Sequence, residues 1–355
     1  MFRSLARMPL ELCVSLLLVA AANAETRIGA ASVSITPDQP VAVSGQFHLR
    51  IARNVESPVT ANVLVLESRE NDRCLDVAVM VSCDLVSIPP DLLTELRAVV
   101  GQRVADLDVN KIFLNGTHAH TAPVVRRDKY RVPEDRAMSV AAYREFFVDR
   151  VAGAIAQAWE QRTPGRCSWG LDHAVVAYNR RAVYANGSAK MYGATDTADF
   201  KGLEGGEDHD VGCLFCWNAE NQLIAVCVNV ACPAQEVESR AAVNADYWHP
   251  VRESLRARFG PQLCVLGWIG AAGDQSPHLM YRKTADERMR QLRDHSRLEE
   301  IARRVVRAVE DTFEVVQHDQ QENLELRHHV ETVELPGRRV TDAEYAEAKA
   351  AVEQA

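Results

Sequence analysis

Residues 60–86 read TANVLVLESRENDRCLDVAVMVSCDLV, and this stretch decides the class of fold. Two apolar runs, TANVLVLES and LDVAVMVSCDLV, flank the polar segment RENDR. Apolar runs of strand length on both sides of a short polar segment are typical of a β-hairpin, whose strands are antiparallel. The runs VGCLFCW and LIAVCVNVAC, around NAENQ, repeat this pattern further along the chain. A sheet of parallel strands alone is therefore not expected.

Helical patterns alternate with the strands. Apolar residues recur at intervals of three and four in residues 139–161, which predicts an amphipathic helix. Further helices are expected over residues 91–102, 245–260, 287–313 and 341–355, and further strands over residues 27–37, 111–115, 262–270 and 324–335. Interleaved strands and helices with several hairpins indicate an α/β fold with mixed sheets and flanking helices.

The first 24 residues have the pattern of a signal peptide. Arg3 and Arg7 give a positive start, LCVSLLLVAAA is an apolar run of suitable length, and Ala22-Asn23-Ala24 is a small-x-small cleavage pattern. The run is too short to cross a bilayer as a helix. We therefore expect an exported protein, periplasmic or secreted. It would have one domain over residues 25–355 and no membrane-spanning segment after cleavage.

Charge and cysteine content limit the partners. The formal net charge is −9 and no long basic run occurs, which argues against nucleic acid or anionic membrane surfaces as the main partner. The expected partner is a small-molecule or lipid substrate. Export invites disulfides, yet cysteines such as Cys83 and Cys264 lie inside apolar strand patterns, where buried free thiols are expected. Cys213 and Cys216 are three apart on a predicted strand, so their thiols would face opposite sides and make a poor metal pair.

Two histidines follow the short predicted strand KIFLN. In NGTHAHTAPVV, His118 and His120 are two residues apart, so both rings project to the same side of an extended segment. Neutral imidazole is a common zinc ligand, and the carboxyl end of a strand is where α/β folds place their sites. A surface turn with two solvated histidines is the alternative, and the spacing favours the functional interpretation.

Two other segments carry candidate chemistry. GAAGDQSPH, residues 270–278, follows a predicted buried strand and offers Asp274 to orient neighbours and Ser276 as nucleophile or hydrogen-bond donor. It lacks the Gly-x-Ser-x-Gly pattern of a serine-hydrolase elbow and would also serve as a plain turn. Arg180, after another predicted strand, offers a planar fork for a carboxylate or oxyanion.

In this order the segments resemble the N-terminal catalytic domain of the neutral/alkaline ceramidases, over roughly residues 27–280. The family motif T-H-T-H-S-G-P resembles residues 117–123, THAHTAP. Its G-D-V-S-P-N resembles residues 273–278, GDQSPH, and its N-R-S-P-S-A-Y resembles residues 179–184 loosely after Asn179-Arg180.

The resemblance implies a zinc-dependent amidase that cleaves the N-acyl bond of a ceramide-like sphingolipid, a lipid-metabolism hydrolase. It implies that His118 ligates Zn²⁺, that His120 helps to stabilise the reacting oxygen, and that Arg180 lines the pocket. Ser276 would lie near the scissile group. Zinc-activated water would make an acyl-enzyme unnecessary.

The chain departs from the family at the other zinc ligands. The strand that carries the family's second zinc histidine matches VNVACPAQEVES, where Pro233 stands at the histidine's place. The family's glutamate and tyrosine ligands lie downstream of the G-D-x-S-P segment and have no recognisable counterpart here. Either a C-terminally shortened chain or an incomplete metal site is expected.

Three hypotheses follow from these departures. The first is an exported zinc-dependent hydrolase of an amide or ester. The second is a non-catalytic relative that has lost the metal site and binds a lipid or glycan. The third is a re-formed metal site in which Cys232, His249 or His278 joins His118; a hydrogen-bonded structural role is the competing interpretation for the two histidines.

Overall fold

The computed structural model describes residues 24–133 and 135–354. The predicted signal peptide and its cleavage site therefore lie almost wholly outside the described residues. Among those residues no helix is long and apolar enough to cross a membrane.

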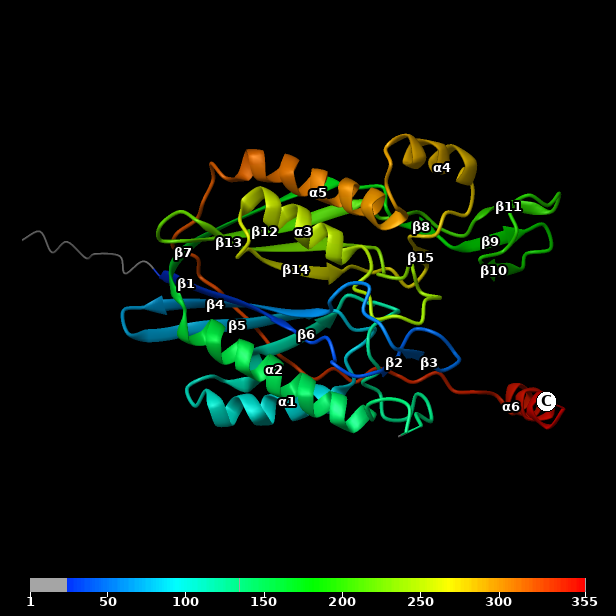
Figure 1. Ribbon diagram of the computed structural model, residues 1–355, viewed down its shortest axis with the longest axis horizontal. Coiled ribbons are helices and arrows are strands. Elements are labelled where there is room, and N and C mark those ends of the chain that lie inside the picture. Colours follow the sequence, from blue (N-terminus) through cyan, green and yellow to red (C-terminus); the bar gives the residue numbers. More distant parts are fainter. Residues whose placement is uncertain (1–23, 134, 355) are drawn as a thin grey trace, which may run out of the picture.

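The predicted α/β architecture with mixed sheets, hairpins and flanking helices is confirmed (Figure 1). The strands of the large sheet are β1 (Glu25–Ser34), β4 (Thr60–Glu70), β5 (Arg73–Cys83), β6 (Ile112–Gly116), β7 (Thr163–His173), β12 (Asp210–Asn218), β13 (Leu223–Val230) and β14 (Cys264–Ile269). Their order in space is β14-β13-β12-β7-β1-β4-β5-β6. The helices are α1 (Pro90–Arg103), α2 (Val140–Glu160), α3 (Trp248–Phe259), α4 (Lys283–Leu292), α5 (Arg297–Val316) and α6 (Asp342–Glu353).

The two halves of this sheet have the same topology, although no repeat is visible in the sequence. In the first half, β1 pairs antiparallel with β4, β4 with β5, and β6 then returns parallel to β5. In the second half, β7, β12, β13 and β14 repeat these pairings in the same order. A parallel return needs a crossover, and α1 and α3 supply it in the respective halves. Each half therefore ends in a short strand at the sheet's edge.

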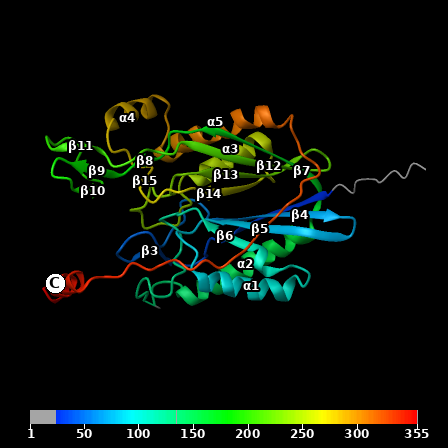
Figure 2. The same ribbon diagram turned by 180° about the vertical axis from the view of Figure 1, so that it is seen from behind.

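The halves stack on each other, so the molecule has four layers. β14 contacts β1, β4, β5 and β6 of the other half. Helices α1 and α2 cover the outer face of the first half, and α3 and α5 cover that of the second, as both views show (Figures 1 and 2). Between the sheet layers lies a small apolar core whose members include Ile28, Leu64, Met80, Cys167, Cys216, Cys227, Cys264 and Leu266.

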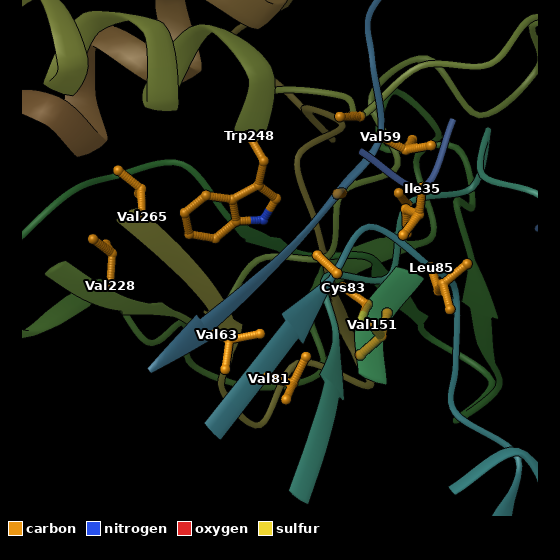
Figure 3. Packing of buried hydrophobic residues seen from close by; sticks show 14 of the residues in the cluster. Ile35, Val59, Val63, Val81, Cys83, Leu85, Val151, Val228, Trp248 and Val265 are labelled. Carbon is orange, nitrogen blue, oxygen red and sulfur yellow. The ribbon is translucent and has the colours of Figure 1, made fainter. Parts of the chain in front are cut away.

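The cores under the helices are built mainly from valine, leucine and aromatic side chains. Trp248, at the start of α3, lies over β14 beside Val265 (Figure 3). An added Cβ at Gly267 would lie 2.6 Å from its ring, so glycine is what allows the indole to lie flat against the strand. Pro250 lies in the first turn of α3, where the missing N–H costs no helical hydrogen bond.

Small sheets accompany the large one. They are β2 (Val41–Val43) with β3 (Arg50–Ala52), β8 (Tyr178–Asn179) with β15 (Gln275–Ser276), and β9 (Arg181–Tyr184) between β10 (Ala189–Met191) and β11 (Phe200–Leu203). One short 3-10 turn, Val109–Lys111, precedes β6.

Two expected elements were wrong. The helix over residues 287–313 is two helices, because Asp294 takes a left-handed conformation (φ 55°) and Ser296 starts α5 with a capping box to Glu299. The strand over residues 324–335 is an irregular segment without a ladder. It is held instead by side chains, as where His328 N donates to Asp76 Oδ2 at 2.6 Å.

Candidate active site

The histidine turn begins where β6 ends. Thr117 is fully buried; its N–H donates to Cys83 O (2.9 Å) and its hydroxyl to Asp84 Oδ1 (3.2 Å). His118 then takes a left-handed conformation with φ 62°, and its Nδ1 lies 2.8 Å from Val86 O. A carbonyl only accepts, so Nδ1 carries the proton and Nε2 keeps a lone pair. The hydrogen bonds of Thr117 and His118 therefore fix the conformation of the turn.

A buried ion pair supports this turn. Arg252 donates two hydrogen bonds to Asp84, Nη1 to Oδ2 at 2.7 Å and Nη2 to Oδ1 at 2.9 Å. Both side chains are almost fully buried, at 2% and 0% exposed. Because Asp84 also accepts from Thr117, the charge pair connects α3 to the residue that precedes His118.

His120 faces a carboxylate. Its ring centroid lies 4.7 Å from that of His118, and its Nδ1 lies 2.9 Å from Glu238 Oε2. The contact is an ion pair rather than an aligned hydrogen bond, because His120 Nδ1 has no hydrogen-bond partner among the described residues. Burial alone would raise the pKa of Glu238, but its contact with His120 and the charges of His278 and Arg180 outweigh this and lower it.

Arg50 holds the backbone around this pair. It is 6% exposed and donates to the carbonyls of His120 (2.7 Å) and Arg240 (2.6 Å), and also to those of Glu238 and Ser44. The loops that carry the imidazole and the carboxylate are therefore joined by one guanidinium. Gly45 allows the close approach: its φ is 101°, and an added Cβ would lie 2.5 Å from the Cβ of His120.

His118 is held neutral near neutral pH. Its pKa is lowered, first by burial and then by the neighbouring His120, with Arg180 adding to the effect. A backbone hydrogen bond to Val86 opposes the shift without cancelling it. His118 thus presents an unprotonated Nε2.

Ser276 lies in a polar network beside this pair. Its fully buried Oγ is 3.1 Å from Gln235 Nε2, 3.1 Å from the Tyr192 hydroxyl, and accepts from His278 N at 3.1 Å. Within the described part of the chain no imidazole nitrogen contacts this hydroxyl. In this arrangement Ser276 Oγ accepts hydrogen bonds from Gln235, Tyr192 and His278.

Arg180 and Asp274 flank the network in different ways. The Arg180 guanidinium donates to the Tyr192 hydroxyl (3.2 Å) and to Gly273 O (2.9 Å). Its charge also contributes to the lowered pKa values of His118 and Glu238. The Asp274 carboxylate accepts from Asn179 Nδ2 at 3.0 Å and so holds the turn together.

The remaining candidate ligands lie in separate surroundings. His278 approaches the pair most directly, with Nδ1 3.9 Å from Glu238 Oε1 and Nε2 3.0 Å from Gln235 O. The Cys232 thiol is fully buried and directed at Val176 O, and burial raises its pKa well above the ordinary value. His249 is half-buried at the start of α3, where the nearby charges are Glu253, Arg252 and Asp84.

The imidazoles of this site are candidate ligands for the expected zinc. A catalytic zinc site needs three protein ligands and an open position. His118 fits one ligand, because the Val86 carbonyl orients its ring and leaves Nε2 free, and His120 offers a second imidazole beside it. Residues 24–133 and 135–354 contain no group of three or more His, Cys, Asp or Glu side chains arranged to hold a metal ion. These residues therefore do not fit a complete zinc site.

Comparison with known proteins bears on the fold of the chain. No protein-family model and no curated protein sequence matches the chain. The crystal structure of neutral ceramidase from Pseudomonas aeruginosa matches with a TM-score of 0.65 and 16% identity, over 82% of this chain and 45% of that one. This chain has the neutral ceramidase fold. A structure of ceramidase complexed with C2 matches similarly, with a TM-score of 0.63 and 16% identity, over 82% of this chain and 44% of that one.

The fold resemblance stated from the sequence motifs is thus confirmed as a distant one. The chain spans less than half the length of these neutral ceramidase structures. In this fold the HAH turn follows β6 and the GDQSPH turn follows β14, so the two equivalent edge strands deliver the two motifs to one site.

Sequence reasoning missed three contributors to the site. Glu238 follows the CPAQ turn on a loop whose path no local pattern predicts. Arg50 and Tyr192 lie on the small β2–β3 sheet and after β10 respectively, elements that were not expected. The only local sequence feature at Glu238 is the pair of acidic residues in QEVES, residues 235–239. Such a pair is also typical of a solvent-exposed turn.

Proposed function

We propose that this chain is a hydrolase that cleaves an amide or ester bond with His120 as general base and Glu238 as its orienting carboxylate. The observation that carries the proposal is the 2.9 Å contact between His120 Nδ1 and Glu238 Oε2. Arg50 donates hydrogen bonds to the backbone carbonyls of both residues and so holds them in place. A base oriented by a carboxylate, with its other nitrogen free, is the recurring device for activating water.

His120 and Glu238 carry the reaction through two proton transfers. Water gives a proton to Nε2 of His120 while its oxygen attacks the carbonyl carbon. The resulting imidazolium is stabilised by Glu238 and returns the proton to the leaving nitrogen or oxygen as the carbonyl bond re-forms. Arg180 supplies positive charge for the developing oxyanion, and its guanidinium also donates to the Tyr192 hydroxyl. Ser276 and Gln235 hold Tyr192 in place.

The substrate class proposed is an N-acyl amide of the ceramide kind. Its support is the fold shared with the neutral ceramidase structures, together with a cavity of about 600 Å³ beside the network. Tyr192, His278, Leu279, Met280 and Tyr281 are among the residues that line this cavity. Mixed apolar and polar walls suit an acyl chain with a polar linkage.

The test compares Glu238→Gln with a matched control, Glu331→Gln. Glu331 also lies beside a histidine, 3.5 Å from His329, but its side chain is 69% exposed and it is distant in sequence from the residues of the candidate site. We expect Glu238→Gln to lower kcat by about 10²–10⁴-fold on an N-acyl amide or matched ester, because the base loses its orienting charge. The control should leave kcat unchanged. Equal rates for both variants and the wild type would overturn the proposal, provided that circular dichroism shows both folded.

The second candidate is the zinc-dependent hydrolase that the resemblance implied. It is favoured by the orientation of His118, whose Nδ1 on Val86 O leaves Nε2 free, as in metal-ligating histidines. Elemental analysis of the purified chain separates the two candidates. About one equivalent of zinc, lost in His118→Ala, would support the second candidate, and zinc-free protein with full turnover would support the first.

Export to the periplasm or medium belongs to the same proposal. The signal-peptide pattern of residues 1–24 supports it. Amino-terminal sequencing of protein recovered outside the cytoplasm should begin at Glu25; a first residue of Met1 would contradict export by this leader.

A further inference from the structure

Four cysteine side chains meet in the apolar core between the two sheet layers. They are Cys167 on β7, Cys216 on β12, Cys227 on β13 and Cys264 on β14, all at most 2% exposed. Two of them are in contact: the Sγ atoms of Cys167 and Cys216 lie 3.6 Å apart. We propose that Cys167 and Cys216 form a cross-strand disulfide when the chain folds under oxidising conditions.

The backbone geometry supports this pair. Cys167 and Cys216 lie directly opposite each other in the antiparallel β7·β12 ladder. The N–H and C=O of Cys167 both bond to Gln321, on the side of β7 away from β12. Because both groups of one strand residue point to the same side, this pair is a non-hydrogen-bonded one, in which the Cα atoms are about 4.5 Å apart and the side chains are closest. That separation lies within the range that a disulfide needs, about 4.4–6.8 Å between Cα atoms.

The other two thiols of this core, those of Cys227 and Cys264, are less well placed to form a disulfide. Cys227 lies opposite Leu214 on β12, and Cys264 opposite Ala225 on β13. The Cys264 thiol is also directed at the carbonyls of Ala31 and Val63, on the other sheet layer. Neither faces a cysteine across a ladder, so the geometry singles out the β7–β12 pair.

The chemistry needs an oxidant, and a low-molecular-weight disulfide such as oxidised glutathione supplies it. One thiolate attacks the small disulfide to give a mixed disulfide and a free thiol. The second thiolate then displaces the remaining small thiol, so that two protein thiols become one disulfide and one small disulfide becomes two thiols. The hydrogen bond to Cys167, together with burial, raises the pKa of Cys216 well above its ordinary value, which makes the folded pair unreactive. Oxidation therefore belongs to folding, before the layers close.

The experiment is refolding of the reduced chain with a mixture of reduced and oxidised glutathione, and in parallel with reductant alone. The products are denatured, alkylated and weighed as intact protein, and then digested for peptide mapping. We expect the oxidised sample to take up two fewer alkyl groups, with a peptide pair joined through Cys167 and Cys216. Cys216→Ala should abolish this difference. Cys213→Ala, on the opposite face of the same strand, should leave it unchanged.

Two results would overturn the proposal. One is full alkylation of the oxidatively refolded wild type, and the other is a mapped bridge between any other pair. If Cys216→Ala fails to refold, the peptide map of the wild type decides by itself, since it identifies the bridged cysteines directly.

Discussion

The buried ion pair below the histidine turn gives the sharpest stability prediction. Arg252→Met removes the only cation that contacts Asp84 among the described residues, and leaves a carboxylate of 0% exposure with its hydroxyl and amide donors alone. Breaking a buried pair by removing one partner costs about 3–5 kcal/mol of unfolding free energy. Hydrogen bonds from Thr60 and Thr117 to Asp84 remain, and the methionine side chain fills much of the space of the arginine. Both offset part of this cost, so we expect a loss of unfolding free energy near the lower end of that range.

Urea unfolding at pH 7, followed by circular dichroism, measures this loss. Arg256→Met is the matched control, since Arg256 lies one turn further along α3 and pairs with Glu253, which is 58% exposed. Its removal should cost less than about 1 kcal/mol. Adding Asp84→Asn to Arg252→Met should restore part of the stability, because the uncompensated charge is gone. Equal losses for the two arginine variants would refute the idea that this pair anchors the turn.

Two further predictions concern packing and pH. Gly267→Ala should cost about 1–3 kcal/mol in urea unfolding, because its Cβ would meet the Trp248 ring, whereas Gly202→Ala, with open space around it, should stay within about 0.5 kcal/mol. Burial raises the pKa of Asp246 to about 7, against the backbone N–H donors that lower it. The folded state therefore holds this proton more tightly, and stability should fall as pH rises from about 4 to 7, by on the order of 4 kcal/mol. Asp246→Asn should remove that part of the pH dependence, and an unchanged slope between pH 5 and pH 8 would contradict it.

The sequence predicted the sheet well because local patterns determined it. The hairpins around RENDR and NAENQ, and the strand before His118, are each bounded by polar turns and carry apolar residues that the core requires. What no local pattern contained is the stacking of two similar halves. That arrangement depends on contacts between β14 and strands more than 150 residues earlier, such as Ser82 Oγ to Gly267 O.

The two wrong elements have local explanations. Residues 287–313 have helical periodicity throughout, but Ser296 and Glu299 form a capping box, which begins a helix and therefore ends the preceding one. This signal was present in the sequence. The segment 324–335 alternates like a strand, yet alternation requires a partner strand, and Asp76 and Thr26 bind its backbone through side chains instead.

The candidate site was predicted in part for the same reason. His118, His120 and Ser276 follow strands that the sequence marks clearly, so their positions at strand ends could be inferred. Glu238 and His120 lie on two loops that are 118 residues apart in sequence, and Arg50 joins these loops. Such a contact has no local signature.

The measurement that tests the central claim most directly is turnover of N-acyl amides and matched esters by the purified chain, compared with His120→Ala. The account predicts measurable hydrolysis by the wild type and a loss of at least about 10²-fold in the variant, with both proteins folded. A folded wild type without turnover of any substrate in the panel, or a variant as active as the wild type, would contradict the assignment of His120 and Glu238 as the hydrolytic pair.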